Sequence, residues 1–272
     1  MKKNQKSNLI FMLSMALSSL VIIASCIGLF LPETYAKETP DWIAQAIGQD
    51  IIDLFLITPV LVISAIFAYT GNKIARLVWS GSLFYLIYSY VIYCFAVHFN
   101  SMFIIYCLIL GLSFYLFVYF LISHSKKSVS NWFKNKIPNK ITGIYLIVIA
   151  CLFYILWLSE LIPAICINSS PKSLIDTGLL TNPIHVLDLS VCLPALFITG
   201  LLLLRKHYLG LLLTFPMLVF SVLMDITIIV LVIVMKIKGL ETNLGLTILM
   251  GLLAVASGWL LYLMLKCIKK GA

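Results

Sequence analysis

The chain has 272 residues, of which 62% are hydrophobic and only 11% are charged, and its mean hydropathy is +1.10. This composition excludes an ordinary soluble domain and predicts an integral membrane protein. The formal net charge is +9, but the basic residues stand in short runs between apolar segments. That pattern is typical of membrane loops, so we expect no nucleic-acid partner.

A helix needs about 20 apolar residues to cross the hydrocarbon core of a bilayer. Eight segments meet this requirement, at about 8–31, 50–69, 77–97, 102–122, 142–162, 184–204, 209–235 and 244–265. We therefore predict an all-α, multi-pass protein of eight transmembrane helices embedded in the lipid bilayer. An even number of spans places both termini on the same side.

The basic residues orient the predicted spans. Of the 19 Lys and Arg residues, only Lys37, Lys172, Lys236 and Lys238 lie on the side away from the termini. Because cytoplasmic loops carry the excess of Lys and Arg, the sequence predicts a bacterial-type inner membrane with cytoplasmic N- and C-termini. The ten acidic residues all fall in the spans or the outer loops.

Two segments allow a second interpretation. The apolar run 8–31 follows Lys2 and Lys3, as in a signal peptide, but it is longer than the 7–15 residues typical of a signal sequence. We expect it to remain as the first span, whereas cleavage would leave seven. The loop 123–141 has five lysines around Trp132 and Phe133, so we expect it to lie on the anionic inner leaflet, with docking of another protein as the alternative.

An internal duplication is visible at an offset of 135 residues. Segments 53–65 and 188–200 share five identities over 13 positions, including Asp53 with Asp188 and Pro59 with Pro194. Upstream, an offset of 131 aligns the prolines of the preceding loops, which are Pro32 with Pro163 and Pro40 with Pro171. The shift of four helices predicts two parallel four-helix repeats, residues 1–141 and 142–272. Chance similarity between Leu-rich helices is the alternative.

The ionisable residues of the spans gather toward the outer side. Asp53 and Asp188 are mates in the duplication, and Asp50 and His185 precede them by three residues, so each pair shares a helical face. Asp225 is the deepest acidic residue in the predicted spans. The candidate binding residues are Asp53, Asp188, Asp225, His185, Asp50, Glu160, His98 and Gln49. Charges within a bilayer are costly, so such side chains usually face a bundle interior or a wet cavity.

A structural interpretation competes with the functional one. Asp50, Glu160 and His98 could be ordinary helix-end residues, and Asp53, Asp188 and His185 could form a network that only holds the halves together. Helices three and four are rich in aromatic residues, which predict ordinary packing or, as the alternative, a groove for a lipid or isoprenoid. Tyr85 and Tyr88 lie too deep for the interfacial aromatic belt, so we expect their hydroxyls to find partners inside the bundle.

Three function classes remain open. The carboxylates favour transport or sensing of a small solute or cation. The first alternative is a membrane enzyme acting on a lipid or lipid-linked substrate at the outer face, and the second is a non-catalytic subunit. Only His98 and His185 of the four histidines lie on the outer side, so the three-histidine zinc site of the ceramidase and adiponectin-receptor group is missing, although an all-oxygen Mg²⁺ or Ca²⁺ site remains open.

Several specific chemistries are excluded. The spans hold no deep lysine for a retinal Schiff base, and the sequence has no Gly-x-Gly-Asp pair for an intramembrane aspartyl protease. A Gly-x-Ser-x-Gly nucleophile elbow and a phosphate loop are likewise missing. The seven cysteines include no Cys-x-x-Cys pair and predict packing, with a Cys26–Cys166 disulfide as a less favoured possibility.

Overall fold

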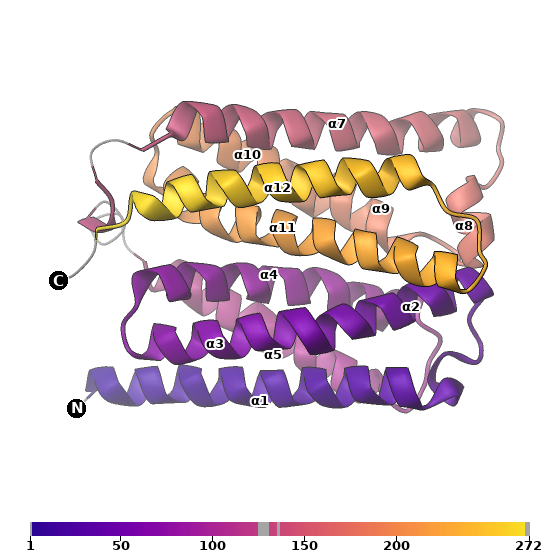
Figure 1. Ribbon diagram of the computed structural model, residues 1–272, viewed down its shortest axis with the longest axis horizontal. Helices are drawn as coiled ribbons and strands as arrows, with labels where there is room; N and C mark the ends of the chain where they lie inside the picture. The colour runs from indigo at the N-terminus through magenta and orange to yellow at the C-terminus, as the bar shows by residue number, and fades with distance from the viewer. Residues whose placement is uncertain (1, 125–130, 135–136, 270–272) are drawn as a thin grey trace.

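The structure, a computed structural model, describes residues 2–124, 131–134 and 137–269. Over these residues the chain is helical, and eight helical segments are long and apolar enough to cross a membrane. This confirms the predicted all-helical class and agrees with the prediction of eight spans, and we use the word span for these eight segments. The helices run side by side, so the molecule has two ends (Figure 1). We call the end that carries both chain termini the terminal end, and the other the opposite end.

Six of the spans are single helices and two combine three segments each. The single helices are α1 (Lys2–Phe30), α4 (Lys73–Ala96), α5 (Phe103–Ile122), α7 (Asn139–Cys166), α11 (Tyr208–Ile237) and α12 (Leu244–Lys266). The combined spans are α2 (Pro40–Ile52) with η2 (Asp53–Ile57) and α3 (Thr58–Tyr69), and α9 (Pro183–Leu187) with η3 (Asp188–Cys192) and α10 (Leu193–Leu204). Two short helices lie between spans at the opposite end, η1 (Pro32–Tyr35) and α8 (Lys172–Thr177).

The second span begins at Pro40 rather than near residue 50, which corrects the predicted boundary. Thr39 caps it, because its side chain accepts a hydrogen bond from the Trp42 amide at 3.3 Å. The polar residues of α2 resemble a loop in sequence, yet they are helical, and Asp50 among them is buried. Asp50 and Asp53 therefore lie well inside the span, and the interpretation of Asp50 as a helix-end residue is wrong.

Both combined spans contain a widened, π-helical turn, and the two turns lie at positions that the sequence alignment at an offset of 135 residues matches. The Thr58 amide donates to the Asp53 carbonyl in η2, and the Leu193 amide donates to the Asp188 carbonyl in η3, each an i to i+5 hydrogen bond. Pro59 and Pro194 follow these turns. A proline inside a helix lacks an N–H and clashes with the carbonyl four residues before it. The wider turn relieves that clash, and such turns often occur at functional sites.

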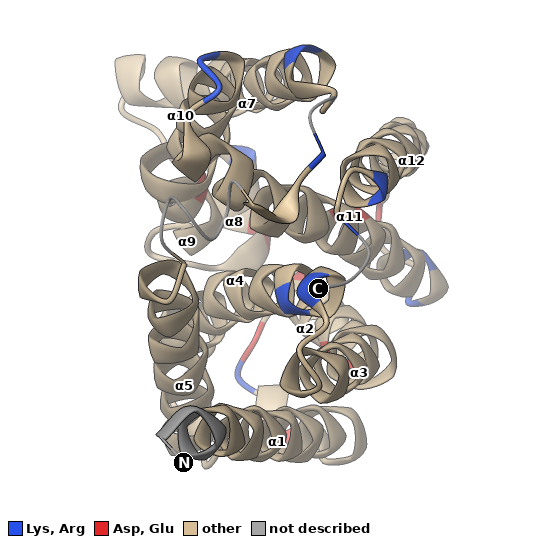
Figure 2. Cartoon of the chain, turned by 90° about the vertical axis from the view of Figure 1, so that its left-hand side faces the viewer, with Lys and Arg blue, Asp and Glu red and all other residues tan. Residues whose placement is uncertain are grey.

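The two halves of the chain share some neighbour relations but not all, because α1 also packs on α5 whereas no comparable packing joins α7 and α12 among the described residues. In residues 1–141, α3 packs on both α1 and α4, and α4 packs on α5; in residues 142–272, α10 packs on both α7 and α11, and α11 packs on α12. Seen from the terminal end, the first half occupies the lower part of the molecule and the second half the upper part (Figure 2).

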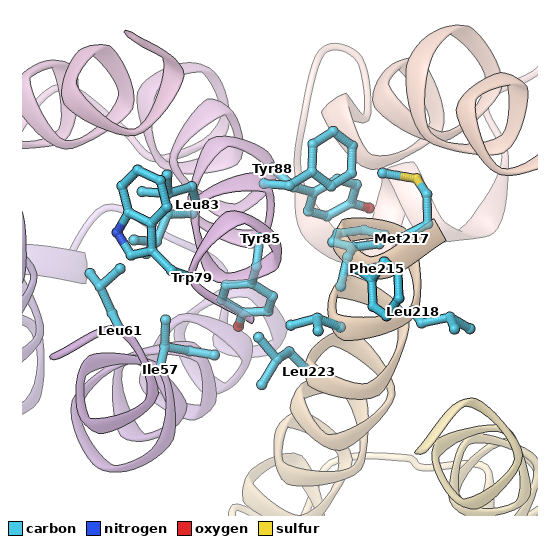
Figure 3. Close-up of a cluster of buried hydrophobic side chains, with 14 of the residues drawn as sticks. Ile57, Leu61, Trp79, Leu83, Tyr85, Tyr88, Phe215, Met217, Leu218 and Leu223 are labelled. Carbon is cyan, nitrogen blue, oxygen red and sulfur yellow. The ribbon is translucent and has the colours of Figure 1, made fainter. Parts of the chain in front are cut away.

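The interface between the halves is centred on α4 and α11. It is extended by α2, which packs on α11, and by α9, which packs on α4. Gly81 lets the two central helices approach, because a Cβ at this position would overlap the side chain of Val219. Large buried side chains, among them Phe215, Leu218 and Leu223 of α11, fill the adjoining core (Figure 3).

The described part of the segment that connects the halves packs into the bundle. Trp132 and Phe133 are buried, and the Phe133 ring stacks on Phe215 at 5.5 Å between centroids. Phe133 also pairs with Ile268 in an isolated β-bridge. Trp132 and Phe133 therefore do not rest on the membrane surface, whereas the expectation that the loop 123–141 as a whole lies on the inner leaflet stays a prediction. The hydrophobic gain from burial inside the bundle competes with adsorption to the leaflet and wins here. The neighbouring residues 125–130 and 135–136 lie outside the described residues.

Candidate functional site

Asp50 sits in a closed cluster of tyrosines in the first half. Its side chain is 1% exposed, and its two carboxylate oxygens accept hydrogen bonds from the Tyr35 hydroxyl at 2.7 Å and the Tyr93 hydroxyl at 2.8 Å. Gly28 of α1 makes room for this arrangement, because a Cβ there would overlap the carboxylate and the Tyr35 hydroxyl. Burial and the nearby Asp50 raise the pKa of Tyr35, which keeps its hydroxyl a donor.

Asp53 lies one turn further along and is fully buried. The Gln49 amide donates to one carboxylate oxygen at 2.9 Å, whereas the other oxygen has no partner among the described residues. The Gln49 amide also lies 2.7 Å from the Tyr85 hydroxyl, which in turn lies 2.8 Å from the hydroxyl of Thr227 on α11. Figure 3 shows the Tyr85 hydroxyl between Ile57 and Leu223, at the boundary between the halves. A hydrogen-bonded chain therefore connects Asp53 with α11.

A cavity with a volume of about 370 Å³ lies mainly in the second half, and we call it the acidic cavity. Residues of α7, η3, α10, α11 and α12 line it, and α2 and α4 close it from the first half. Most of the lining is apolar, but Asp188 and Asp225 both face the cavity, together with Gln49 and Thr227. The end of the hydrogen-bonded chain from Asp53 thus borders the space that the other two aspartates share.

Aromatic groups hold Asp188 in place. The Trp157 indole N–H donates to its carboxylate at 2.8 Å, and the Tyr88 hydroxyl lies beside the same carboxylate. The expectation that deep tyrosine hydroxyls find partners inside the bundle is confirmed for Tyr85, which lies within hydrogen-bond distance of Gln49 and Thr227. The Trp157 ring packs against the His185 ring with 4.6 Å between centroids. His185 therefore contacts the tryptophan that donates to Asp188, and it forms no hydrogen bond or ion pair with Asp188 itself.

Asp225 differs from the other buried carboxylates, because no described residue forms a hydrogen bond or ion pair with it. Its side chain is 6% exposed, and one of its oxygens is fully buried without a partner. It is the eighteenth of the 30 residues of α11, close to the middle of that span. A carboxylate in such surroundings is costly unless it is protonated or meets a positively charged group.

The remaining candidate residues lie apart from the acidic cavity. The Glu160 carboxylate is 3.9 Å from the His185 ring and accepts the Ser173 amide at 3.1 Å, so it holds α8 against α7. His98 follows α4, its side chain is 56% exposed, and its ring nitrogen is 3.0 Å from the buried Glu38 carboxylate. These contacts agree with the structural interpretation of Glu160 and His98. The eight candidate residues therefore do not form one site.

Tyr35, Tyr93, Trp157 and Thr227 are contributors that the candidate list did not include. Thr227 stands two residues after Asp225, and the other three are aromatic residues with a polar atom. In an apolar span such an atom must find a partner, and buried carboxylates are strong acceptors. That rule, applied to every deep tyrosine and tryptophan, is the signal that would have found three of them.

The described residues contain no group of three or more His, Cys, Asp and Glu side chains that could hold a metal ion. All seven cysteines are free, including Cys26 and Cys166, so the less favoured disulfide does not form. No family model, curated protein or solved structure matches this chain.

Proposed function

We propose that this protein binds a small cationic solute with apolar groups in the acidic cavity and moves it across the membrane. The observation that carries the proposal is Asp225, a buried carboxylate without a partner that faces the same cavity as Asp188. The lining contains no lysine, arginine or histidine. A cation that enters would therefore supply the charge that the two carboxylates lack.

The apolar walls narrow the class of solute. Side chains such as Phe153, Phe220 and Met250 line most of the acidic cavity. Binding sites of this kind gain affinity from apolar contact and orientation from a few polar groups. A compact ammonium group attached to an aromatic or aliphatic body matches both features, whereas a strongly hydrated inorganic ion would leave the apolar walls unused.

Two related halves support movement rather than simple binding. We propose that residues 1–141 and 142–272 are parallel repeats, in line with the shared π-helical turns and the matching neighbour relations described above. In transporters with repeats, the substrate site lies near the middle of the bilayer and the halves rock around it. The acidic cavity borders α2 and α4 of the other half, so rocking at this interface would change access to it.

The excess of basic residues gives the proposed orientation. We propose an inner-membrane protein whose terminal end faces the cytoplasm, because Lys and Arg concentrate there (Figure 2). The outer side then corresponds to the opposite end, which carries η1 and α8. A lipid-directed enzyme gains no specific support from the contacts of the acidic cavity.

The test uses the full chain, purified and reconstituted in liposomes, and radiolabelled benzyltrimethylammonium as the probe. This probe carries a permanent charge on an aromatic body, so it does not cross the bilayer as a neutral amine. We expect saturable binding and uptake by the wild type, and at least a tenfold loss of affinity in Asp225→Asn and in Asp188→Asn. Glu241→Gln removes an acidic group whose side chain is 99% exposed, so it serves as the matched control.

Each outcome has a defined meaning. Binding that depends on Asp225 but is not followed by uptake would replace transport by sensing. Equal binding by the wild type and the double variant Asp188→Asn, Asp225→Asn would refute the acidic cavity as the site. Equal competition by the uncharged carbon analogue of the probe would refute the selection for positive charge.

A further inference from the structure

A second cavity, at the terminal end of the first half, has the opposite charge. It has a volume of about 270 Å³ and lies among α1, α3, α4 and α5. We call it the terminal pocket. Its polar lining residues are Ser7, Ser14, Tyr69, Arg76, Tyr119, Ser123 and His124. It shares no lining residue with the acidic cavity, so it requires a separate explanation.

Among the described residues that line this pocket, Arg76 is the one with a permanent charge. Its side chain is partly buried, and it forms no hydrogen bond or ion pair with any described residue. All ten acidic residues of the chain are among the described residues, and each lies in a loop or half-span toward the opposite end. A carboxylate from the chain's own side chains therefore cannot neutralise this guanidinium.

The other polar groups are placed to assist an anion. Ser7 and Ser14 stand seven residues apart on α1, on one helical face with Ile10 and Phe11, and this face forms one wall of the terminal pocket. Ser14 is held at the floor, where its hydroxyl accepts from the Trp79 indole at 3.1 Å and donates to the Ile10 carbonyl at 2.8 Å. Ser7, Tyr119 and Ser123 add hydroxyl donors to the lining.

His124 adds a group that can change its charge. One ring nitrogen donates to the Phe120 carbonyl at 2.5 Å, so the other nitrogen takes up the proton when the ring becomes charged. Burial and the nearby Arg76 lower the pKa of His124. The groups that face it are Arg76 of α4 and Tyr119 of α5, together with Tyr69 of α3. An anion between Arg76 and His124 would favour the charged ring.

We propose that the terminal pocket binds a phosphate group, with Arg76 as the principal ligand and His124 and the hydroxyls of Ser7 and Ser123 as further donors. The planar guanidinium presents paired N–H donors that match the oxygens of a phosphate. A bound anion would also supply the negative charge that no described residue gives Arg76. The phosphate could belong to a soluble compound or to a lipid headgroup, since basic pockets between membrane helices bind both kinds of group. This site is independent of the acidic cavity.

The chain offers a matched control, because it contains only two arginines, Arg76 and Arg205. Arg205 follows α10 at the same end of the molecule, is exposed, and lies outside the terminal pocket. We would titrate the purified full chain in a nonionic detergent by calorimetry with inorganic phosphate, with dihexanoyl phosphatidic acid and with dihexanoyl phosphatidylcholine. The first two present a phosphate group of high charge, and the third is the zwitterionic control.

We expect inorganic phosphate or phosphatidic acid to bind the wild type, and Arg76→Gln to weaken that binding at least tenfold. Arg205→Gln should change it less than twofold, and Asp225→Asn, which tests the acidic cavity, should leave it unchanged. Similar affinity for both probes would identify a soluble phosphate compound as the source. Binding of phosphatidic acid alone would identify a lipid headgroup.

The proposal is overturned if neither probe binds the wild type, if Arg76→Gln binds as well as the wild type, or if Arg205→Gln loses as much affinity. If Arg76→Gln does not fold, Arg76→Lys and Arg205→Lys take its place, because lysine keeps the charge and loses only the paired geometry. We then expect a three- to tenfold loss for Arg76→Lys and none for Arg205→Lys. Equal affinities of these two variants would contradict the assignment.

Discussion

Replacing either tyrosine of the Asp50 cluster tests whether that carboxylate is charged inside the bundle. The carboxylate of Asp50, which is 1% exposed, accepts two hydrogen bonds from hydroxyl groups. Tyr93→Phe removes one of these donors and Tyr35→Phe removes the other. A hydrogen bond to a charged group contributes about 1.5–3 kcal/mol, whereas neutral side-chain hydrogen bonds in membrane proteins average about 0.6 kcal/mol. The loss of stability therefore reports the charge of Asp50.

We expect each single variant to lose about 1.5–3 kcal/mol of unfolding free energy, because no other described residue compensates the carboxylate. The double variant should lose more than the sum of the single losses, since it leaves the carboxylate without a donor, and the excess should be at least about 0.5 kcal/mol. Equilibrium unfolding of the purified chain in mixed micelles with increasing sodium dodecyl sulfate measures all three values.

Tyr115→Phe is the control for the loss of a hydroxyl, because Tyr115 is 73% exposed and lies on the outer surface of α5. We expect it to change stability by less than about 0.5 kcal/mol. Losses of about 0.6 kcal/mol in the single variants with additive behaviour would mean that Asp50 is protonated. Losses no larger than that of Tyr115→Phe would refute the cluster as a stabilising feature.

Three other perturbations test separate parts of the molecule. Gly200→Ala should destabilise by about 1–3 kcal/mol in the same unfolding assay, because its Cβ would press on the backbone of α7; Gly251→Ala, which meets nothing within 4 Å, should be neutral or stabilising by up to about 1 kcal/mol. The wild type should lose stability as the pH falls below about 6.5, which is the pKa of histidine in an unfolded chain. The pKa of His124 is lowered in the folded state, so just below that pH only the unfolded chain takes up the proton. The variant His124→Gln should lack this part of the loss, and a pH profile equal to that of the wild type would contradict the prediction. In single-cysteine variants on intact cells, an impermeant maleimide should label Cys166 at the opposite end, whereas Cys267 at the terminal end should react only after lysis; the reverse result would invert the proposed orientation.

The number and class of the spans could be predicted because apolar length alone determines them. The start of the second span could not be predicted, because Gln45, Gln49 and Asp50 lower its local hydrophobicity, although Asp50 is buried and the two glutamines are partly buried. Hydropathy measures transfer to lipid, whereas a polar residue in a bundle interior is decided by its partners. The burial of Trp132 and Phe133 could not be predicted for a related reason. The contacts of Phe133 with Phe215 and Ile268 join residues that are distant in the sequence.

The candidate residues could be selected by charge within apolar sequence, but their grouping could not. Asp188 and Asp225 share a cavity because α10 and α11 pack together, a relation that spacing along the chain does not contain. Glu160 and His98 satisfied the same sequence criterion but lie outside the cavity. Glu160 contacts Ser173 of α8, and His98 pairs with Glu38. The sequence alignment of Asp53 with Asp188 agrees with their local structure, because each begins a widened turn that is followed by a proline.

The pairing of Phe133 with Ile268 has a consequence for biosynthesis. Ile268 is synthesised 135 residues after Phe133, close to the end of translation. The contact between them therefore cannot form while the earlier spans insert. Lys134 and Lys269 reinforce it through backbone hydrogen bonds to Cys267 and Trp132, each at 2.8 Å. Until the last helix arrives, the aromatic pair has no such partner, and nascent chains shortened before residue 268 should remain open to protease at this joint.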